Sequence, residues 1–412
     1  MTEKLAIQNG TKIKMVPFPD WPQYDEKEEK ALLEVLRSRV WWRTPGTKTL
    51  EFEEKFAAYQ QAQYGIACTN GTAALEIAIA ALGIGMGDEV IVPDFTFVAS
   101  ASAVLSVGAM PVLVDVDPGT YCIDPEKVAA AVTPRTKAIV AVHIAGHPAD
   151  MDRLKEIARV HNLFLIEDSA HAHGSEWKGH KVGSLGTVGT FSFQASKLMT
   201  AGEGGMLITN NEELAIRLRS VHDCGRMPDQ WFYSHYIYGS NYRLSEWQGA
   251  ILTQQLGRLA GQTAVRSRNA AILDKALLGI EGIRPQLLDP RVTCHGHYCY
   301  IFHYDKAAFA GLPTETFIQA LNAEGIPTQA SYPSVRKLDV FQNGEFRKRL
   351  SSEHARQDFA FLKAGCPVTD DAAENTVWLV HRTLLGSQQD TEDIVAAVKK
   401  IQQQRAYQVG DK

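Results

Sequence analysis

Three short stretches of the sequence hold side chains that can do chemistry. They are TNGTAALEIAIAAL from Thr69, LFLIEDSAHAHG with Asp168, and FSFQASKLMTAGEGG with Lys197. Taken singly, each has an ordinary structural interpretation, as a capped helix, a carboxylate that caps a turn, or a loop lysine in solvent. Their chemical interpretation depends on whether the fold brings them into one pocket.

The first stretch predicts an anion site at the start of a helix. A strand-like run ends before Asn70, Asn70 and Gly71 turn the chain, and a helical pattern begins near Thr72. Free backbone N–H groups and the helix dipole at such an end favour a phosphate, and a glycine allows the backbone to approach it closely. Gly71 and Thr72 are therefore candidate phosphate ligands.

The other two stretches supply a carboxylate and an amine. Asp168 ends the run LFLIED, and open α/β sheets bind ligands at the carboxyl ends of their strands. Lys197 follows an apolar run and precedes a glycine turn, so its amine can be desolvated and made nucleophilic. Ser192 precedes Lys197 by five residues, so its hydroxyl could reach the same pocket.

Together these parts match the needs of pyridoxal 5'-phosphate. Its phosphate needs N–H and hydroxyl donors, its pyridine nitrogen needs a carboxylate that keeps it protonated, and its aldehyde needs a lysine amine. The order along the chain is the phosphate turn, then Asp168, then Lys197, which is the order of fold-type I enzymes. The sequence therefore predicts this cofactor.

A metal site is the weaker interpretation of the histidines and cysteines near residue 295. Cys294 and Cys299 have no CxxC partner elsewhere, and His295 and His297 lie between them. A zinc site needs a fixed set of ligands, whereas a polar loop with scattered histidines needs none. We therefore expect no metal, and free thiols in a reducing cytoplasm.

An alternation of strands and helices must position these side chains. From Tyr64 onward, apolar runs such as DEVIVP, PVLVDV, KAIVAVHIAG and LFLIEDSA alternate with helical segments. Continuous Val and Ile runs indicate strands buried on both faces, and the alternation predicts a parallel sheet between layers of helices. The sequence predicts an α/β fold with a large, mixed but mostly parallel sheet.

The pattern changes beyond about Arg258. A long helix is expected from about Leu259 to Leu278, followed by CYIFHYDK and a helix near Glu315 to Glu324. We therefore predict a large cofactor-binding domain over 15–258 and a small C-terminal α+β domain over 259–405. The first twenty residues look like an arm.

Composition narrows the partners of the chain. The net charge is −5 and the pI near 6.2, so no overall basic field favours nucleic acid. The apolar runs contain charge or glycine and fall short of a membrane span, and the start, MTEKLAIQNGTKIK, holds no apolar signal core. We expect a cytoplasmic protein that binds small molecules, with no nucleic acid and no membrane.

The chain resembles the DegT/DnrJ/EryC1/StrS aminotransferases, which act on sugars and cyclitols, over nearly its whole length. The motifs that carry the resemblance include NGTAALEIA, GDEVIVPDFTFVAS, IEDSAHAHGS, FSFQASKLMTAGEGG and GSNYRLSEWQGAIL. The resemblance implies a fold of the aspartate-aminotransferase type, pyridoxal 5'-phosphate as the cofactor, and a homodimer whose subunits share their active sites.

The resemblance also implies roles for individual residues. Lys197 would hold the cofactor as a Schiff base and act as a general base, and Asp168 would pair with the pyridine nitrogen. Gly71, Thr72 and Ser192 would bind the phosphate.

Three more residues complete the implied cofactor site. Phe97 would stack on the cofactor face, and His171 would lie near its phenolic oxygen. Asn241 would reach the phosphate from the other subunit. The histidine at 171, together with WPQYD, WWR and CGR, is also similar to the 3-amino-5-hydroxybenzoate synthase branch of this family.

Four residues are weaker candidates for substrate contacts. Trp42 and Arg43 belong to the loop WWRTPG, which we expect to border the pocket, and Arg43 could meet a carboxylate or a phosphate. Hydrophobic packing with a solvated arginine is the alternative. Arg243 lies two residues after Asn241, and His381 would lie on the small domain's side of the cleft.

The principal functional hypothesis is an aminotransferase of secondary-metabolite or surface-sugar biosynthesis. It would take nitrogen from glutamine or glutamate, carry it as pyridoxamine 5'-phosphate, and deliver it to the ketone of a sugar nucleotide or a cyclitol-like ring. A second hypothesis keeps the cofactor but has the enzyme dehydrate an amino-cyclohexenone to an aromatic ring. A third is a non-catalytic regulatory homologue, against which the intact Asp168, Ser192 and Lys197 argue.

Overall fold

The largest element of the computed structural model, which describes residues 4–227, 230–356, 359 and 365–404, is a seven-stranded sheet. Its strand order is β1-β9-β8-β5-β4-β2-β3. The bounds are β1 (Tyr64–Cys68), β2 (Glu89–Pro93), β3 (Met110–Val114), β4 (Thr136–Val142), β5 (Phe164–Asp168), β8 (Val188–Ser192) and β9 (Gly205–Thr209). Strands β3, β2, β4, β5 and β8 pair in parallel, and β9 is antiparallel to both β8 and β1. The predicted mixed, mostly parallel sheet is confirmed.

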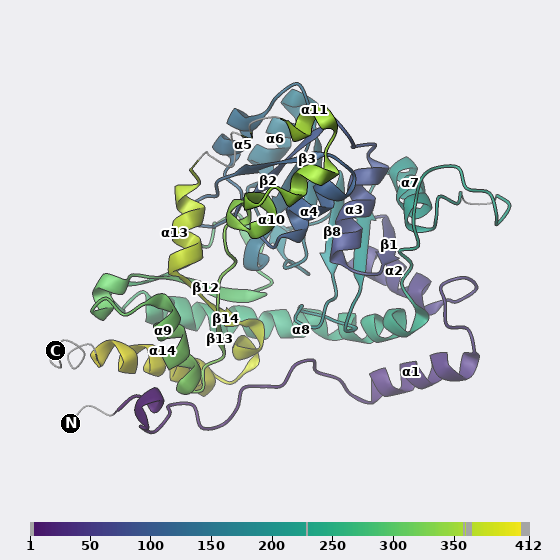
Figure 1. The fold of residues 1–412 in the computed structure, drawn as a ribbon. Coiled ribbons are helices and arrows are strands. Elements are labelled where there is room, and N and C mark those ends of the chain that lie inside the picture. The colour runs from purple at the N-terminus through teal and green to yellow at the C-terminus, as the bar shows by residue number, and fades with distance from the viewer. Residues whose placement is uncertain (1–3, 228–229, 357–358, 360–364, 405–412) are drawn as a thin grey trace.

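Helices cover both faces of this sheet (Figure 1). One face packs against α3 (Gly71–Ala81), α4 (Ala99–Ser106) and α7 (Glu212–His222). The other packs against α2 (Lys48–Tyr59), α5 (Pro125–Ala131), α6 (Met151–His161) and part of α8 (Glu246–Leu277). Neighbouring strand residues such as Ile91 and Val92 point into opposite clusters, which is why the strands are apolar throughout.

A smaller, four-stranded antiparallel sheet lies beside the large one, with strand order β10-β12-β14-β13. The bounds are β10 (Ile283–Pro285), β12 (Cys299–Tyr304), β13 (Thr328–Ala330) and β14 (Thr376–Val380). Helices α9 (Thr314–Ala323) and α14 (Gln388–Gln403) share its hydrophobic core. The remaining elements are α1 (Glu26–Ser38), α10 (Asp339–Gln342), α11 (Ser352–Ala355), α13 (Pro367–Asn375), β6 (Glu176–Trp177), β7 (His180–Lys181) and β11 (Val292–Cys294).

Helix α8 joins the two sheets. It runs without interruption from Glu246 to Leu277, below the strands of the large sheet in the view of Figure 1. Ser245 caps it in a capping box with Gln248, so the helix begins well before the start near Leu259 that the sequence pattern suggested. The predicted boundary between residues 258 and 259 falls inside this helix, residue 405 lies outside the described residues, and the division into two domains stays a prediction.

The N-terminal arm crosses the C-terminal elements before it reaches α1 (Figure 1). Lys14 pairs with Asp390 and Asp393, and buried Glu324 accepts the backbone N–H groups of Ala6 and Ile13. These bonds join the first residues of the chain to α9 and α14 of the small sheet.

Candidate active site

The carboxyl ends of the parallel strands border a cavity of about 740 Å³, which we call the main cavity. Its walls come from the turn before α3, from the segment between β2 and α4, from the ends of β5 and β8, and from residues that flank β12 and β13. The sequence-predicted residues that line it are Gly71, Thr72, Phe97, Asp168, His171, Ser192 and Lys197. The fold therefore brings the three chemical stretches into one site.

Lys197 presents a buried amine to the main cavity. The residue lies shortly after β8 and is 9% exposed. Burial lowers the pKa of Lys197 to about 8, because desolvation disfavours the ammonium more than nearby Asp168 stabilises it. Nζ lies 4.4 Å from the centre of the Tyr298 ring, and among the described residues it has no hydrogen-bond or ion-pair partner. The amine is thus free to react with a ligand.

The carboxylate of Asp168 is held in a fixed orientation at the end of β5. Ser100 Oγ donates a hydrogen bond to Oδ2 at 2.8 Å, and the backbone N–H of Ala170 donates to Oδ1 at 3.2 Å. Thr96 and Ser100 share a further hydrogen bond at 2.9 Å, which anchors the hydroxyl itself. Asp168 is buried and lines the main cavity, so a cationic ring nitrogen could meet it away from water.

The start of α3 provides unused backbone donors. Asn70 caps the helix by accepting the N–H of Ala73 at 2.8 Å, which leaves the N–H groups of Gly71 and Thr72 without an acceptor in the described structure. A Cβ atom at Gly71 would lie 2.7 Å from Cβ of Ser192, so only glycine allows these two segments to approach so closely. The result is a small cradle of N–H and hydroxyl donors.

His171 is a neutral histidine within an aromatic stack. Its ring lies 4.0 Å from that of Tyr298 at 22°, its Nδ1 accepts the N–H of Ala145 at 3.3 Å, and its Nε2 is 3.2 Å from the Tyr332 hydroxyl. Burial, and then the charge of Lys197, hold the pKa of His171 well below its ordinary value. Since Nδ1 accepts, Nε2 carries the proton and can donate it to a ligand oxygen.

His173 supports the wall of the site rather than facing solvent. It is fully buried, and its Nε2 donates to the carbonyl oxygen of Ser192 at 2.9 Å. Burial lowers its pKa to about 3, so the ring stays neutral. This bond positions the strand end that carries the Ser192 hydroxyl.

Phe97 offers an exposed aromatic face at the main cavity. It is 53% exposed, although it lines the cavity, and its ring lies 5.9 Å from that of Tyr332. A large aromatic side chain with this much exposure inside a cavity suits a flat ring stacked on it.

These features fit pyridoxal 5'-phosphate on structural grounds. The unpaired N–H groups at Gly71 and Thr72, with Ser192, match a phosphate; the oriented carboxylate of Asp168 matches a pyridine nitrogen; and the unpartnered Lys197 amine matches an aldehyde. The donor set therefore agrees with the cofactor that the sequence indicated.

A second cavity, of about 310 Å³, adjoins the first, and we call it the side cavity. Ser196 and Tyr298 line both. His381, predicted as a substrate residue, lies in the side cavity, where Trp21 packs edge-on against it with ring centres 4.5 Å apart. Burial lowers the pKa of His381 to about 3.

The other predicted residues do not line the main cavity. Trp42 is 43% exposed, and Arg43 is bound to the buried carboxylate of Glu53. Arg243 pairs with Asp223, and Asn241 is exposed beside it. A substrate role for Trp42, Arg43 and Arg243, and a reach of Asn241 into a partner's site, stay predictions.

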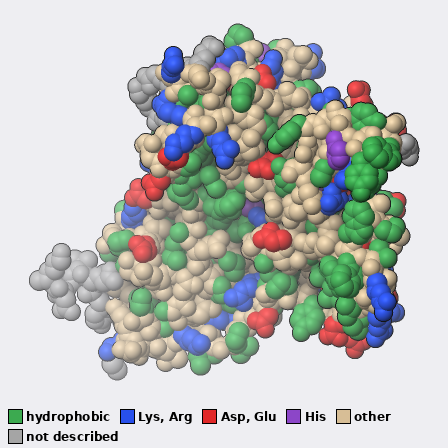
Figure 2. Space-filling view, turned by 45° about the vertical axis from the view of Figure 1, so that its right-hand side comes forward, with side chains coloured by type: hydrophobic (Ala, Val, Ile, Leu, Met, Phe, Trp, Pro, Cys, Tyr) green, Lys and Arg blue, Asp and Glu red, His purple; other side chains and the backbone are tan. Residues whose placement is uncertain are grey.

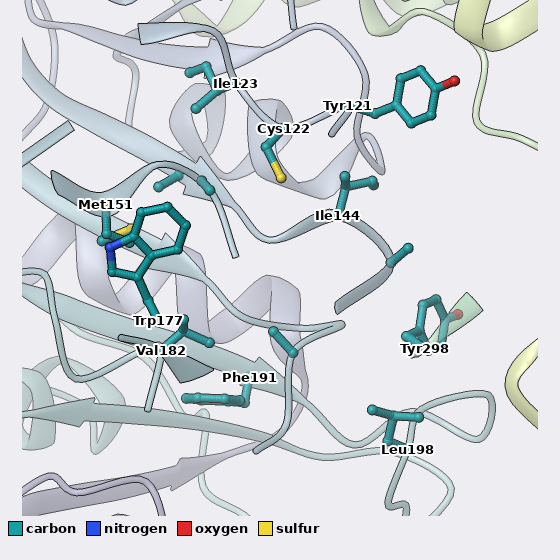
Figure 3. Packing of buried hydrophobic residues seen from close by; sticks show 14 of the residues in the cluster. Tyr121, Cys122, Ile123, Ile144, Met151, Trp177, Val182, Phe191, Leu198 and Tyr298 are labelled. Atoms are coloured by element: carbon teal, nitrogen blue, oxygen red, sulfur yellow. The ribbon is translucent and has the colours of Figure 1, made fainter. Parts of the chain in front are cut away.

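Sequence reasoning missed Ser100, Tyr298 and Tyr332. Ser100 lies three residues after Phe97 in GDEVIVPDFTFVAS, a spacing that places both near the start of one helix and could have revealed it. Tyr298 lies just before β12 and Tyr332 just after β13, and no local pattern connects them to Lys197. Leu198, the residue after Lys197, and Tyr298 belong to one hydrophobic cluster, in which both are labelled in Figure 3.

Two further observations concern partners of other kinds. Within the described parts of the chain, His, Cys, Asp and Glu form no group of three or more that could hold a metal ion. No helix in the same parts combines the length and the apolar character that crossing a bilayer requires.

Comparison with known proteins agrees with the geometry. Residues 22–399 match the DegT/DnrJ/EryC1/StrS aminotransferase family. The L-glutamine:2-deoxy-scyllo-inosose aminotransferase of Streptoalloteichus tenebrarius is 41% identical over 97% of this chain and 98% of that protein. The 3-amino-5-hydroxybenzoate synthase of Amycolatopsis mediterranei is 42% identical over 92% and 96%.

A solved structure shows the same fold. The crystal structure of a 3-amino-5-hydroxybenzoic acid synthase superposes with a TM-score of 0.87 at 40% identity, covering 94% of this chain and 99% of that one. The fold type inferred from the sequence is thereby confirmed, and the family implies pyridoxal 5'-phosphate. The chain belongs to the DegT/DnrJ/EryC1/StrS aminotransferase family.

Proposed function

We propose that this chain is an aminotransferase that moves an amino group from L-glutamine to the ketone of a cyclitol, with pyridoxal 5'-phosphate held at the main cavity. The observation that carries the proposal is the buried Lys197 amine, whose pKa is lowered to about 8, in one cavity with Asp168 and the start of α3. The sugar and cyclitol aminotransferase activity agrees with the family and with relatives named for glutamine-dependent transfer to scyllo-inosose.

Each residue around the cavity has a task that follows from its surroundings. The cofactor, when bound, supplies an electron sink and carries the amino group between substrates as pyridoxamine 5'-phosphate. Lys197 Nζ would take the proton from the α-carbon of the amino donor. In the second half-reaction it would deliver a proton to the former ketone carbon of the acceptor. Asp168 would keep the ring nitrogen charged, and His171 Nε2–H would donate to a ring oxygen.

The charge of the main cavity favours a cyclitol over a sugar nucleotide. Among its described lining residues Lys197 is the one cationic side chain, and the acidic ones are Glu76, Asp168 and Glu203. A diphosphate needs arginines or lysines, whereas a polyhydroxylated ring needs hydrogen-bonding groups without net charge. Relatives named for 2-deoxy-scyllo-inosose have such a ring as their substrate.

Dehydration of an amino-cyclohexenone is the second candidate. It is motivated by the identity and structural similarity to 3-amino-5-hydroxybenzoate synthases. It is less favoured, because more of the similar relatives are named as cyclitol aminotransferases. The two candidates use the same cofactor site and differ in the need for an amino donor.

The decisive experiment combines product analysis with mapping of the cofactor lysine. Protein loaded with pyridoxal 5'-phosphate is incubated with L-glutamine and 2-deoxy-scyllo-inosose, and the amino-cyclitol is measured by mass spectrometry. We expect turnover in the wild type and a loss of several orders of magnitude in Lys197→Ala. Borohydride reduction before proteolysis should leave the pyridoxyl mass on Lys197.

The outcomes separate the candidates. An aromatic product formed from an aminodehydroshikimate-type substrate without any amino donor would favour the dehydratase. Full turnover of Lys197→Ala, or a pyridoxyl label at another residue, would contradict the proposed mechanism. A protein that binds the cofactor but reacts with no amino acid would favour the regulatory homologue.

A further inference from the structure

The side cavity contains a guanidinium without an anionic partner. Arg382 is half-buried there, and its Nη1 donates to the carbonyl oxygen of Pro19 at 3.2 Å. Within the described residues it forms no ion pair with a carboxylate, whereas Arg336 and Arg258 do. Because an arginine stays charged at any physiological pH, partial burial without a counter-ion leaves it poised to bind one.

The surroundings of Arg382 suit a small polar ligand. Gln329 on β13 also lines the side cavity, and its side chain makes no hydrogen bond within the described structure. His381 is neutral, so it does not add to the positive charge of Arg382. Trp21 closes one wall, held by a hydrogen bond from its Nε1 to the carbonyl oxygen of Ala195 at 3.0 Å.

The side cavity shares two lining residues with the main cavity, which holds the reactive amine. Ser196 and Tyr298, which line both cavities, are also hydrogen-bonded to each other at 3.0 Å. Ser196 is the residue before Lys197, and Lys197 Nζ lies over the Tyr298 ring. One molecule can therefore extend from Arg382 past these two side chains with its other end near Lys197.

We propose that Arg382 binds a carboxylate of the amino donor, and that the side cavity is the donor's subsite. This inference rests on the proposed aminotransferase function. Of the two substrates, the amino acid carries a carboxylate and the cyclitol carries no charge, so a guanidinium here recognises the donor alone. The planar fork of Arg382 can hold the carboxylate through two parallel hydrogen bonds, with the donor's amino group toward Lys197.

The experiment follows the donor half-reaction alone. Holoenzyme is mixed rapidly with L-glutamine in the absence of acceptor, and the cofactor absorbance gives an apparent Kd and a limiting rate. We expect Arg382→Gln to raise the apparent Kd about tenfold or more, with the limiting rate within about twofold, because a charge-assisted contact used for binding is lost. The apparent Kd of Arg382→Lys should lie between those of the wild type and Arg382→Gln. Arg268 is exposed and lines neither cavity, so Arg268→Gln should have the apparent Kd of the wild type.

A binding measurement without reaction accompanies the kinetics. Glutarate, an unreactive dicarboxylate, should bind the wild-type holoenzyme by calorimetry and bind Arg382→Gln about tenfold more weakly. The inference is overturned if Arg382→Gln leaves the apparent Kd for L-glutamine and the Kd for glutarate unchanged. It is also overturned if the substitution raises the KM of the acceptor as much as the Kd of the donor. A wild type that reacts with no amino acid refutes the proposed function instead, whatever Arg382 does.

Discussion

At the scale of single residues, Lys197 shows how a side chain that prefers water becomes a reactive amine. It emerges from a buried strand end, and its Nζ faces an aromatic ring instead of a carboxylate. Burial removes the water that solvates the ammonium. The negative charge of Asp168 offsets this loss only in part, so the pKa of Lys197 falls and the neutral amine is favoured. The neutral form is the one that attacks a carbonyl carbon.

This pKa predicts a pH profile for cofactor attachment. The rate at which added pyridoxal 5'-phosphate joins the cofactor-free protein should rise with pH around a midpoint near 8 and then level off, since neutral amine increases as pH rises through the pKa. An ordinary lysine, with a pKa of about 10.4, would keep gaining about tenfold per unit up to pH 10. Absorbance spectroscopy measures the rate, with Nα-acetyl-lysine as the control, and a profile parallel to that control would contradict the assigned environment.

At the scale of elements, Glu53 on α2 joins three parts of the chain. Its buried carboxylate accepts the N–H of Ala67 on β1 at 2.9 Å and is paired with Arg219 on α7 and with Arg43. Arg43 thus connects the loop after α1 to the edge of the large sheet. This bond explains why an arginine next to two tryptophans does not face the main cavity.

Neutralising this carboxylate should loosen the sheet edge. We expect Glu53→Gln to lower the free energy of unfolding by about 2 kcal/mol, because two partly buried guanidinium groups lose their counter-ion. Glu54→Gln, on the exposed side of the same helix, should change it by less than about 0.5 kcal/mol. Urea unfolding followed by circular dichroism compares the two, and equal values would show that the Glu53 network adds no stability.

At the scale of the whole molecule, the described residues between α7 and α8 expose several aromatic side chains. The connection from α7 to α8 projects away from the body of the molecule in Figure 1. It carries several exposed aromatic side chains, with Tyr238 at 94% and Trp231 at 72% exposure. Figure 2, in which this side comes forward, shows hydrophobic side chains grouped on the surface. An exposed apolar segment of this kind, close to Asn241, is consistent with the homodimer that the family resemblance implies.

Mixed dimers test whether Asn241 acts across that interface. Lys197→Ala and Asn241→Ala should each be inactive or impaired alone, whereas a mixture allowed to exchange subunits should regain about a quarter of wild-type activity, since half the dimers then hold one intact site. If Asn241 serves its own subunit, every site keeps one defect and activity does not return. Light scattering on the same samples reports the oligomeric state, and an active monomer would contradict the shared site.

The sequence by itself determined the large sheet and the chemical centre of the site. Apolar runs without alternation identified the strands, because strands covered on both faces need apolar residues at every position. Gly71, Asp168 and Lys197 could be named because each lies at or shortly after the end of a strand, and the carboxyl ends of parallel strands must meet at one edge of a sheet. Apolar runs and the residues at their ends are local features of the sequence, and the geometry of a parallel sheet is enough to place those residues at a common edge.

Only the tertiary structure decided which distant residues complete the site. Tyr298 and Tyr332 line the main cavity from positions beside strands of the small sheet, and the placement of that sheet depends on how two cores pack around α8. Tertiary packing also decides that Arg43 pairs with Glu53 and that His173 is buried and hydrogen-bonded to the carbonyl oxygen of Ser192. Contacts between residues far apart in the chain arise from the shapes of packed surfaces, and no spacing within a single segment encodes those shapes.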